Sequence, residues 1–358
     1  MQGSSVGIAG AGLLGRLLAW RLSRAGHRVT VFDPARNGKP RFDGQGAAGF
    51  SAAGMLSPLA ELDNAGPEVA ALGWRSIALW REIAETLQAR PFFAQRGSLL
   101  LAHRSDIGSA ERVLARLEAG PAGSPVPRPL GAAAMAEMEP GIKGPARAWL
   151  LPGEGQIDPL GTLQALHDEA IGVLWHWEAR VEHMAAGSIE VENGTTHRFD
   201  RVFDVRGVGA RPDLPVRGVR GEVVWLHAPG HGLTRPARLL HARHRVYLVP
   251  RPGDLIVVGA SEVESEDRSA VSLRSAVELM TAAHSVMPAL AEARILRLDA
   301  NLRPALPDNE PRVDVSPGLV RINGLFRHGW LLAPALVDDA LVACGLQGLS
   351  IKQLEVGQ

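Results

Sequence analysis

A glycine-rich segment near the start of the chain constrains its fold more than any other feature. The apolar run over residues 5–9 predicts a strand, and glycines then lead into a predicted helix over 13–25. The residues that would surround an anion at this turn are Gly10, Gly12, Leu13, Leu14 and Gly15. Backbone N–H groups and the helix dipole favour a pyrophosphate there. The segment therefore predicts a strand–turn–helix unit that binds a dinucleotide.

The residues that follow this turn strengthen the interpretation. A second predicted strand, residues 28–33, ends at Asp33, whose carboxylate is placed to accept a hydrogen bond from a ribose hydroxyl. The alternatives are a signal peptide and an ordinary βαβ unit. Arg16, Arg21 and Arg24 interrupt the apolar stretch, which argues against an export signal and against a membrane span. We therefore expect a cytoplasmic protein.

Composition excludes several classes of protein. With 358 residues, the chain exceeds what one hydrophobic core usually covers, so we expect two domains. Lys plus Arg and Asp plus Glu number 38 each, and no block of like charge predicts a nucleic-acid or membrane surface. The single cysteine, Cys344, excludes an internal disulfide and the paired thiols of a disulfide reductase. A small neutral or zwitterionic substrate fits this balance.

Helical and strand patterns interleave along the chain, which predicts a mixed α/β fold. Apolar residues at three- and four-residue intervals after Pro67 predict an amphipathic helix. From Gly221 onward the pattern is mainly β, with predicted strands over 222–227, 246–250, 255–259 and 294–302. A predicted helix over 269–286 lies between the last two of these strands. This part of the chain predicts a second unit built on a sheet.

Segments along the whole chain resemble the glycine oxidase branch of the D-amino-acid oxidase family. Besides the opening turn, the matching segments are 51–58, 247–251, 258–260, 302–304, 307–308 and 324–334. They occur in the family's order and at similar spacing. The resemblance therefore covers nearly the entire chain.

The resemblance implies an FAD held between a Rossmann-like domain and a substrate domain with a large mixed or antiparallel sheet. It implies a discontinuous FAD-binding domain and a substrate-binding domain, formed respectively by residues 1–60, 141–210 and 310–358 and by residues 61–140 and 211–309. The flavin should be noncovalent, because Cys344 lies in the last helical pattern and not where the sarcosine oxidase branch attaches its cofactor. No metal site is expected.

Three residues of the matching segments are expected to act on the substrate. Arg303 matches the family's carboxylate-binding arginine, whose planar guanidinium fits a carboxylate through two hydrogen bonds. Tyr247, the single tyrosine, would hydrogen-bond the same carboxylate or close the pocket. Arg327 matches a family arginine near substrate and flavin. The alternatives are solvated arginines and a half-buried strand tyrosine.

The resemblance also implies the flavin contacts. They are Ser51, Ala52, Ala53, Gly54, Met55, Val181, Gly324, Arg327, His328, Gly329, Trp330 and Leu331. In the family, the last helix begins near Trp330 and its N-terminus points to the flavin carbonyl where negative charge gathers on reduction. The alternatives are plain turns at 51–55 and 324–329 and a surface position for His328.

Two segments depart from the family pattern. Asp204 and Arg206 lie where the family is apolar, and they either pair with each other or face away from the pyrophosphate. The segment from Glu262 to Asp267 is acidic where glycine oxidases are more apolar. A Glu262 that faces the pocket would favour a cationic or bulkier amine, whereas the alternative for this segment is a solvated acidic loop.

The resemblance implies oxidation of a small amino acid, such as glycine, a D-amino acid or an N-alkyl glycine. The imine formed would hydrolyse to an oxo acid, and oxygen or another electron acceptor would reoxidise the flavin. Two alternatives stay open: an FAD-dependent amine dehydrogenase that uses another acceptor, and a flavin-binding subunit regulated by a partner. The family often forms dimers or tetramers, so a homo-oligomer is compatible with the sequence.

Overall fold

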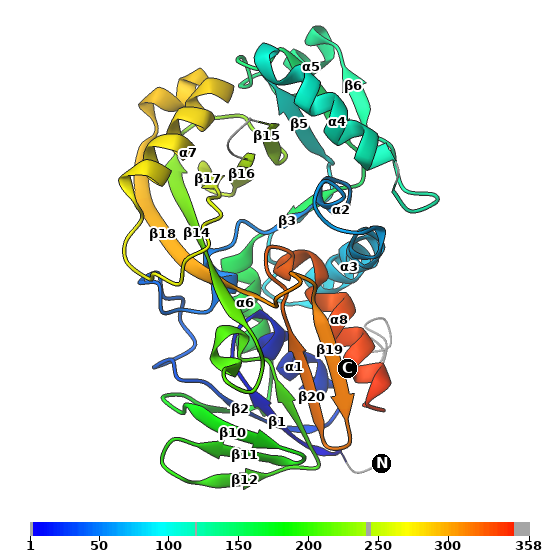
Figure 1. Ribbon diagram of the computed structural model, residues 1–358, viewed down its shortest axis with the longest axis vertical. Helices are drawn as coiled ribbons and strands as arrows, with labels where there is room; N and C mark the ends of the chain where they lie inside the picture. Colours follow the sequence, from blue (N-terminus) through cyan, green and yellow to red (C-terminus); the bar gives the residue numbers. More distant parts are fainter. Residues whose placement is uncertain (1–2, 119, 241–244, 347–358) are drawn as a thin grey trace.

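Two large β-sheets, one in each half of the elongated molecule, organise the chain (Figure 1). The computed structural model describes residues 3–118, 120–240 and 245–346. In spatial order, the six-stranded sheet consists of β19 (Arg312–Ser316), β20 (Leu319–Asn323), β13 (Arg201–Asp204), β1 (Ser5–Ala9), β2 (Arg28–Phe32) and β9 (Leu174–His176). All neighbouring strands in it run parallel except β19 and β20.

Helices cover one face of the six-stranded sheet and a small sheet covers the other. Parallel strands are usually buried on both faces, and β1 and β2 follow this rule with apolar runs. The helical side buries α1, α8, α6 and α3 in one apolar core. The small antiparallel sheet, at the lower end in Figure 1, consists of β10 (Val181–Ala185), β11 (Ser188–Val191) and β12 (Thr196–Arg198).

The second large sheet has eight strands and is mixed. In spatial order it contains β18 (Arg294–Ala305), β14 (Arg217–His227), β17 (Leu255–Gly259), β16 (Arg245–Arg251), β15 (Ala237–Leu240), β5 (Ser98–Ala102), β7 (Arg147–Leu151) and β6 (Arg128–Leu130). Only the pair β15 and β5 runs parallel among these described strands. Helix α7 packs on one face over an apolar core. The predicted mixed α/β fold, with a Rossmann-like part and a large mixed sheet, is confirmed.

Eight α-helices connect and cover the sheets in the described chain. They are α1 (Leu13–Arg24), α2 (Pro58–Glu61), α3 (Pro67–Thr86), α4 (Ile107–Glu118), α5 (Ala132–Met138), α6 (Pro159–Asp168), α7 (Leu273–Val286) and α8 (Gly329–Ala343). Helix α7 begins four residues later than predicted, because Ser272 caps it by accepting a hydrogen bond from the Ser275 N–H. No described helix is long and apolar enough to cross a membrane.

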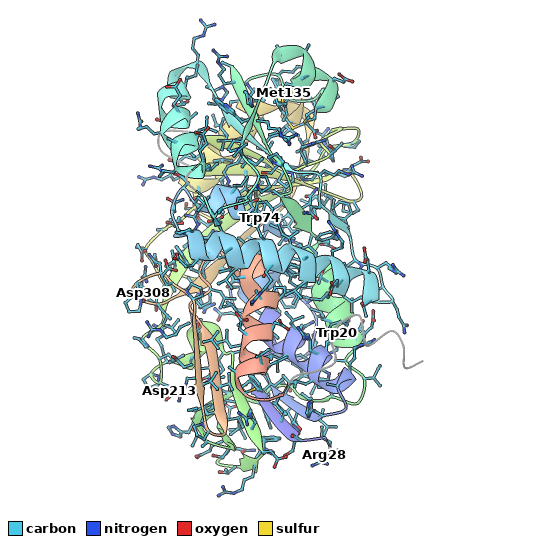
Figure 2. All side chains as sticks on the ribbon, turned by 90° about the vertical axis from the view of Figure 1, so that its right-hand side faces the viewer. Trp20, Arg28, Trp74, Met135, Asp213 and Asp308 are labelled. Carbon is cyan, nitrogen blue, oxygen red and sulfur yellow. The ribbon has the colours of Figure 1, made fainter. Side chains whose placement is uncertain are left out.

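A second small antiparallel sheet lies between the two halves (Figure 1). It consists of β3 (Met55–Leu56), β8 (Gly155–Ile157) and β4 (Phe93–Ala94). Close by, the long helix α3 crosses the molecule near Trp74, between the half that contains Met135 and the half that contains Trp20 (Figure 2). The cavity described below passes through this middle layer.

The expected domain boundaries can be compared with the packing. Strand β7 belongs to the eight-stranded sheet, although residues 141–210 are expected in the FAD-binding domain. Helix α3 packs on α8 in the core of the other half, although residues 61–140 are expected in the substrate-binding domain. The first two and the last twelve residues of the expected domains, 1–2 and 347–358, lie outside the described residues.

Candidate active site

One cavity of about 1100 Å³ runs from the glycine-rich turn to the face of the eight-stranded sheet. Most of the predicted site residues line it, and they come from both ends of the chain. Three predicted residues do not: Gly15, Gly324 and His328. The cavity has a cofactor end, built around Gly12, and a substrate end, built around Arg303.

Two glycines of the turn at the cofactor end, Gly10 and Gly15, have no room for a side chain. Gly10 has φ +105°, and a Cβ there would lie 2.7 Å from the Val205 carbonyl oxygen. A Cβ on Gly15 would lie 1.8 Å from the Gly10 carbonyl oxygen, so Gly15 lets α1 pack against the turn instead of lining the cavity. Gly12 caps α1 without a side chain, and Leu13 and Leu14 of the first turn line the cavity. The free N–H groups of this turn can therefore bind an anion.

Asp33 follows β2 directly and lines the cavity beside the turn. Its Oδ2 accepts a hydrogen bond from the Ala11 N–H at 2.6 Å, and its Oδ1 accepts one from the Ala35 N–H at 2.8 Å. Each carboxylate oxygen can accept more than one hydrogen bond. The position predicted to contact a ribose hydroxyl is thus fixed by two backbone groups and retains acceptor capacity.

Arg16 is a cavity residue that the sequence pattern did not single out as functional. Its side chain is almost fully buried in α1, and it donates to the carbonyl oxygens of Ala11, Leu163 and Gly38 at 2.8, 2.9 and 2.7 Å. Burial lowers its pKa to about 10. Because the three carbonyls come from separate elements, Arg16 fixes the walls around the turn. The signal in the sequence was an arginine next to the glycine turn, one of three charged residues in an otherwise apolar helix.

The stretch 51–55 lines the cavity with all five predicted residues. Gly54 has φ +66°, and a Cβ there would lie 2.2 Å from the Ile157 carbonyl oxygen. Asn301 of β18 donates to the Ser51 Oγ at 3.2 Å and to the Gly46 carbonyl oxygen at 3.1 Å. Hydrogen bonds from Asn301 therefore hold this stretch against the eight-stranded sheet.

Asp204 and Arg206 pair with each other at the carboxyl end of β13. The Arg206 Nε and Nη2 donate to the two Asp204 carboxylate oxygens at 2.9 and 2.7 Å, and Nη2 also contacts Asp213 at 2.8 Å. The Arg206 Nη1 donates to the carbonyl oxygen of Val181 at 3.2 Å. Of the two alternatives, mutual pairing is therefore correct. Val181 lines the cavity, and the contact between its backbone and adenine stays a prediction.

Helix α8 begins at the middle of the cavity. Gly329, Trp330 and Leu331 line it, and the Trp330 Nε1 donates to the Gly49 carbonyl oxygen at 3.1 Å. Gly324 has φ +77° and packs against Leu306 outside the cavity, where a Cβ would lie 2.7 Å from the leucine side chain. The first turn of α8 thus directs its N–H groups toward the region between the two ends.

Arg303 lies at the substrate end, where both of its terminal nitrogens donate to one carbonyl oxygen. Nη1 and Nη2 lie 3.0 and 3.1 Å from the Ser261 carbonyl oxygen. The guanidinium lies over Gly221, where a Cβ would be 2.3 Å from Nη2. Among the described residues, no carboxylate lies within ion-pair distance of Arg303. Burial lowers its pKa from the ordinary value, and the group stays cationic.

Tyr247 lies in a row of three residues across neighbouring strands. It pairs with Arg238 of β15 on one side and with Gly259 of β17 on the other. A Cβ on Gly259 would lie 2.7 Å from the tyrosine ring, so this glycine makes room for the ring. Burial raises the pKa of Tyr247, which keeps the hydroxyl protonated and able to donate. Both Tyr247 and Arg238 line the cavity.

Glu61 at the end of α2 lies within ion-pair distance of three basic side chains. It lies 3.3 Å from Arg327, 3.4 Å from Arg238 and 3.1 Å from the His328 Nδ1. Burial opposes ionisation, but His328 and Arg327 outweigh it and hold the pKa of Glu61 well below its usual range. His328 is therefore a buried partner of Glu61 and neither lines the cavity nor lies at the surface. Neither Glu61 nor Arg238 was predicted, because no local motif marks them.

The acidic segment from Glu262 to Asp267 splits into two parts. Glu262 lines the cavity and its Oε2 lies 3.4 Å from the Arg327 Nη1. Glu264 and Glu266 pair instead with arginines outside the cavity, Arg217 and Arg211. The first residue thus faces the pocket, while the following glutamates form exposed ion pairs.

Cys344 lies away from the cavity at the end of α8. Its thiol is buried and donates to the Leu341 carbonyl oxygen at 3.5 Å, and burial raises its pKa. The described residues contain no cluster of three or more His, Cys, Asp or Glu side chains that could hold a metal ion.

Comparison with known proteins decides the family. Residues 5–338 match the DAO family of FAD-dependent oxidoreductases. The chain belongs to this family. The predicted family and the predicted cofactor, FAD, are thereby confirmed. The glycine turn, Asp33 and the continuous cavity fit the pyrophosphate, the ribose and the length of this cofactor.

Individual relatives show which members of the family this chain is similar to. A thiamine biosynthesis oxidoreductase, ThiO, of Rhizobium etli is 37% identical over 334 residues, which cover 93% of this chain and 94% of the relative. Glycine oxidase of Geobacillus kaustophilus is 27% identical over 361 residues, with 92% and 89% covered. The crystal structure of Geobacillus kaustophilus glycine oxidase has a TM-score of 0.81 at 25% identity and covers 100% of this chain and 96% of its own. The protein is an FAD-dependent oxidoreductase of this type.

Proposed function

We infer that the protein oxidises a small amino acid, such as glycine, a D-amino acid or an N-alkyl glycine, at its α-carbon. The observation that carries this proposal is Arg303, a guanidinium that faces the cavity and has no carboxylate partner among the described residues. A bound carboxylate would supply the missing countercharge through two parallel hydrogen bonds. The name of one relative, glycine oxidase, supports the same substrate class.

The residues of the substrate end would then bind the amino acid and orient it. Arg303 would fix the carboxylate, and the protonated Tyr247 hydroxyl would donate to it or close the pocket. Arg327, held by Glu61 and Glu262, would keep the region beside the α8 N-terminus positive. In systems that hold the reacting groups rigidly, orientation of this kind lowers the activation free energy by up to about 7–11 kcal/mol. When bound, FAD supplies the acceptor for the hydride that leaves the α-carbon.

The residues that would hold FAD lie at the cofactor end. The α1 turn from Gly10 to Leu14 would contact the pyrophosphate, Asp33 the ribose and Val181 the adenine, while the stretch 51–55 and the start of α8 would contact the flavin ring. The cofactor domain would then consist of residues 1–60, 141–210 and 310–358. The packing favours moving β7 into the substrate domain and α3 into the cofactor domain.

Electron balance fixes the products of this reaction. The amino acid loses two electrons and becomes an imine, which water hydrolyses to an oxo acid and ammonia, or to a primary amine where the nitrogen was secondary. Oxygen would accept the electrons as hydrogen peroxide, unless another acceptor takes them. The reaction needs no metal ion.

Anaerobic titration tests the proposal. The purified protein should show a flavin spectrum, and at least one member of a panel of glycine, sarcosine, D-proline and other D-amino acids should bleach it. Readmitting oxygen then shows whether peroxide forms. A flavin spectrum that no amino acid bleaches would contradict the proposed substrate class.

A further inference from the structure

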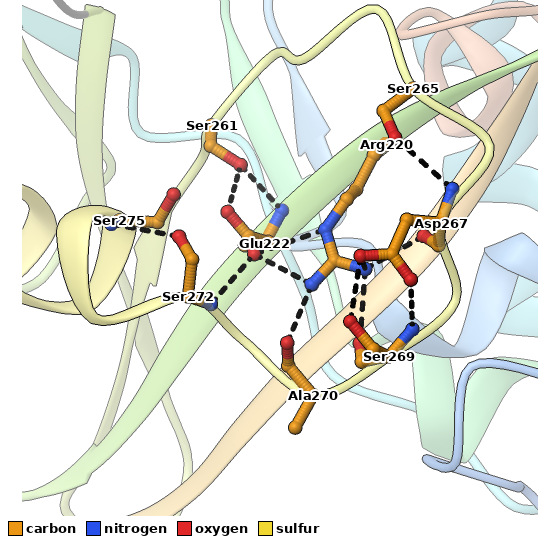
Figure 3. Close-up of polar contacts among 9 residues, drawn as sticks. All are labelled: Arg220, Glu222, Ser261, Ser265, Asp267, Ser269, Ala270, Ser272 and Ser275. Carbon is orange, nitrogen blue, oxygen red and sulfur yellow. Dashed lines mark hydrogen bonds and ion pairs between the residues drawn. The ribbon is translucent and has the colours of Figure 1, made fainter.

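Arg220 and Glu222 form a buried ion pair on β14 (Figure 3). They alternate along the strand with Gly221 and Val223, which line the cavity. Arg220 and Glu222 are 5% and 1% exposed, and two hydrogen bonds of 3.1 and 2.8 Å join the guanidinium to the Glu222 Oε1. Neither residue lines the cavity. Removing such a pair from water is costly unless every polar group finds a partner. The remaining polar groups of this pair must therefore have hydrogen-bond partners nearby.

Arg220 uses all five of its N–H donors. Besides the two hydrogen bonds to Glu222, it donates to the carbonyl oxygens of Asp267, Ser269 and Ala270 at 2.7, 2.9 and 2.8 Å. These carbonyls belong to one segment, residues 261–272, which joins β17 to α7. Arg220 thus anchors the far part of that segment to the sheet, as Figure 3 shows.

Glu222 anchors both ends of the same segment. Its Oε1 accepts from the Ser272 N–H at 3.0 Å, and its Oε2 accepts from the Ser261 Oγ at 2.9 Å. The Ser261 Oγ in turn accepts from the Glu222 N–H at 3.0 Å. Burial raises the pKa of Glu222, but hydrogen bonds from Ser275 and the Ser272 N–H outweigh it and keep the carboxylate ionised.

Ser261 connects this anchor to the substrate end. Its side chain is fixed by Glu222, and its carbonyl oxygen accepts both hydrogen bonds from Arg303. The next residue, Glu262, lies 3.4 Å from Arg327. A shift of Ser261 would therefore move the only described acceptor of the Arg303 guanidinium, and two-point recognition of a carboxylate depends on the plane of that guanidinium.

We propose that Glu222, supported by Arg220, is a positioning residue for substrate recognition, which acts through Ser261 to set the orientation of the Arg303 guanidinium. The proposal rests on the proposed function, because it assumes that Arg303 binds the substrate carboxylate. It assigns a role in specificity to a buried pair that contacts neither substrate nor cofactor.

Ser261→Ala is the variant that tests the link. It removes the hydroxyl that joins Glu222 to Ser261 and leaves the Arg220–Glu222 pair intact, whereas Glu222→Gln would leave the buried Arg220 charge uncompensated. Ser261→Thr restores a hydroxyl. Ser265→Ala is the matched control, because Ser265 lies in the same segment and its Oγ accepts only from the Asp267 N–H among the described contacts.

The experiment measures the dissociation constant of a ligand for the FAD-loaded protein, from the change in flavin absorbance on binding. Acetate probes the carboxylate site and acetamide is its neutral counterpart. We expect Ser261→Ala to weaken acetate binding about tenfold, the equivalent of one hydrogen bond, with acetamide binding and FAD content unchanged. Its melting temperature should fall, because the Oε2 and the N–H of the buried Glu222 both lose the Ser261 hydroxyl. Ser261→Thr should recover most of the loss, and Ser265→Ala should match the parent protein.

A double-mutant cycle with Arg303→Leu completes the test. If Ser261 acts through Arg303, Ser261→Ala should have no further effect on acetate binding in the Arg303→Leu background. Equal behaviour of Ser261→Ala and Ser265→Ala, or an undiminished effect of Ser261→Ala without Arg303, would overturn the proposal and leave the carboxylate clamp standing. Unchanged acetate binding in Arg303→Leu alone would instead overturn the clamp itself.

Discussion

The two ends of the cavity are built by different means. The cofactor end is formed by backbone: glycines in contact with carbonyl oxygens, the first turn of α1 and a carboxylate fixed by N–H groups. The substrate end is formed by side chains, with Arg238, Arg303, Arg327 and Tyr247 projecting from strands and a loop. A backbone site is specified by local sequence, whereas a side-chain site depends on which strands the fold brings together.

This difference predicts how each end tolerates change. At the cofactor end, a methyl group added to Gly10, Gly15 or Gly54 meets a backbone carbonyl oxygen. At the substrate end, a methyl group added to Gly221 meets the end of the flexible Arg303 side chain. The same type of substitution should therefore abolish one site and only perturb the other.

Gly15→Ala should have the largest effect. Its Cβ would lie 1.8 Å from the Gly10 carbonyl oxygen, so α1 has to move away from β1. We expect the free energy of unfolding to fall by more than about 4 kcal/mol, with loss of FAD binding. Thermal denaturation and the ratio of flavin to protein absorbance measure both.

Two other glycines serve as comparisons for Gly15→Ala. Gly12→Ala meets only the Ala47 Cβ at 3.5 Å, so it should keep the fold and weaken FAD binding alone. Gly108→Ala, on α4, meets only the end of Arg112 at 3.9 Å and should change neither property. A Gly15→Ala protein with normal stability and flavin content would show that the turn is not rigid.

Glu154 lies directly before β8, in the small sheet between the two halves of the molecule. It is fully buried, accepts from the Ala60 N–H at 3.0 Å and from Ser98, and burial raises its pKa from 4.5 to about 7. Because the folded protein then binds the proton more tightly than the unfolded chain, stability should fall by about 3 kcal/mol as pH rises from 4.5 to 7.

The variant Glu154→Gln should lose this part of the pH dependence. Its melting temperature should decline less between pH 4.5 and 7 than that of the parent protein, with Glu111→Gln on the exposed face of α4 as the matched control. An identical pH profile in Glu154→Gln and the parent protein would mean that this carboxyl group does not titrate in that range.

Gly221→Ala should have the smallest effect of the three. Its Cβ would lie 2.3 Å from the Arg303 Nη2, but this group is the end of a flexible side chain and can move away. We expect the KM for an amino acid substrate to rise about tenfold, with stability and flavin content unchanged. Gly131→Ala, which meets no atom within 4 Å, is the control. A loss of stability as large as that of Gly15→Ala would erase the distinction between the two ends.

Local sequence was sufficient for much of the fold and for the cofactor end. The strand–turn–helix unit and the helix after Pro67 depend on neighbouring residues, and they formed as predicted. The stretch 51–55 was recognised through the family resemblance and lines the cavity with all five residues.

Most residues of the substrate end could be identified only from the tertiary structure. Glu61, Arg238 and Gly221 lie far apart in the chain and meet only when α2, β15 and β14 pack around one space. The contact of His328 with the flavin stays a prediction, whereas its ion-pair partner Glu61 could not be predicted, because a loop sequence carries no sign of such a partner. Buried charges are paired by topology, so their partners cannot be read from local patterns.

The central claim is that Arg303 recognises the carboxylate of an amino acid at the substrate end. The most direct measurement compares kcat/KM for glycine or sarcosine with that for the same amine without a carboxylate, in the parent protein and in Arg303→Leu. We predict that Arg303→Leu lowers the value for the amino acid about 100-fold and leaves the amine nearly unchanged, while Arg294→Leu at the exposed start of β18 changes neither. An Arg303→Leu protein that keeps its preference for the amino acid would contradict the account.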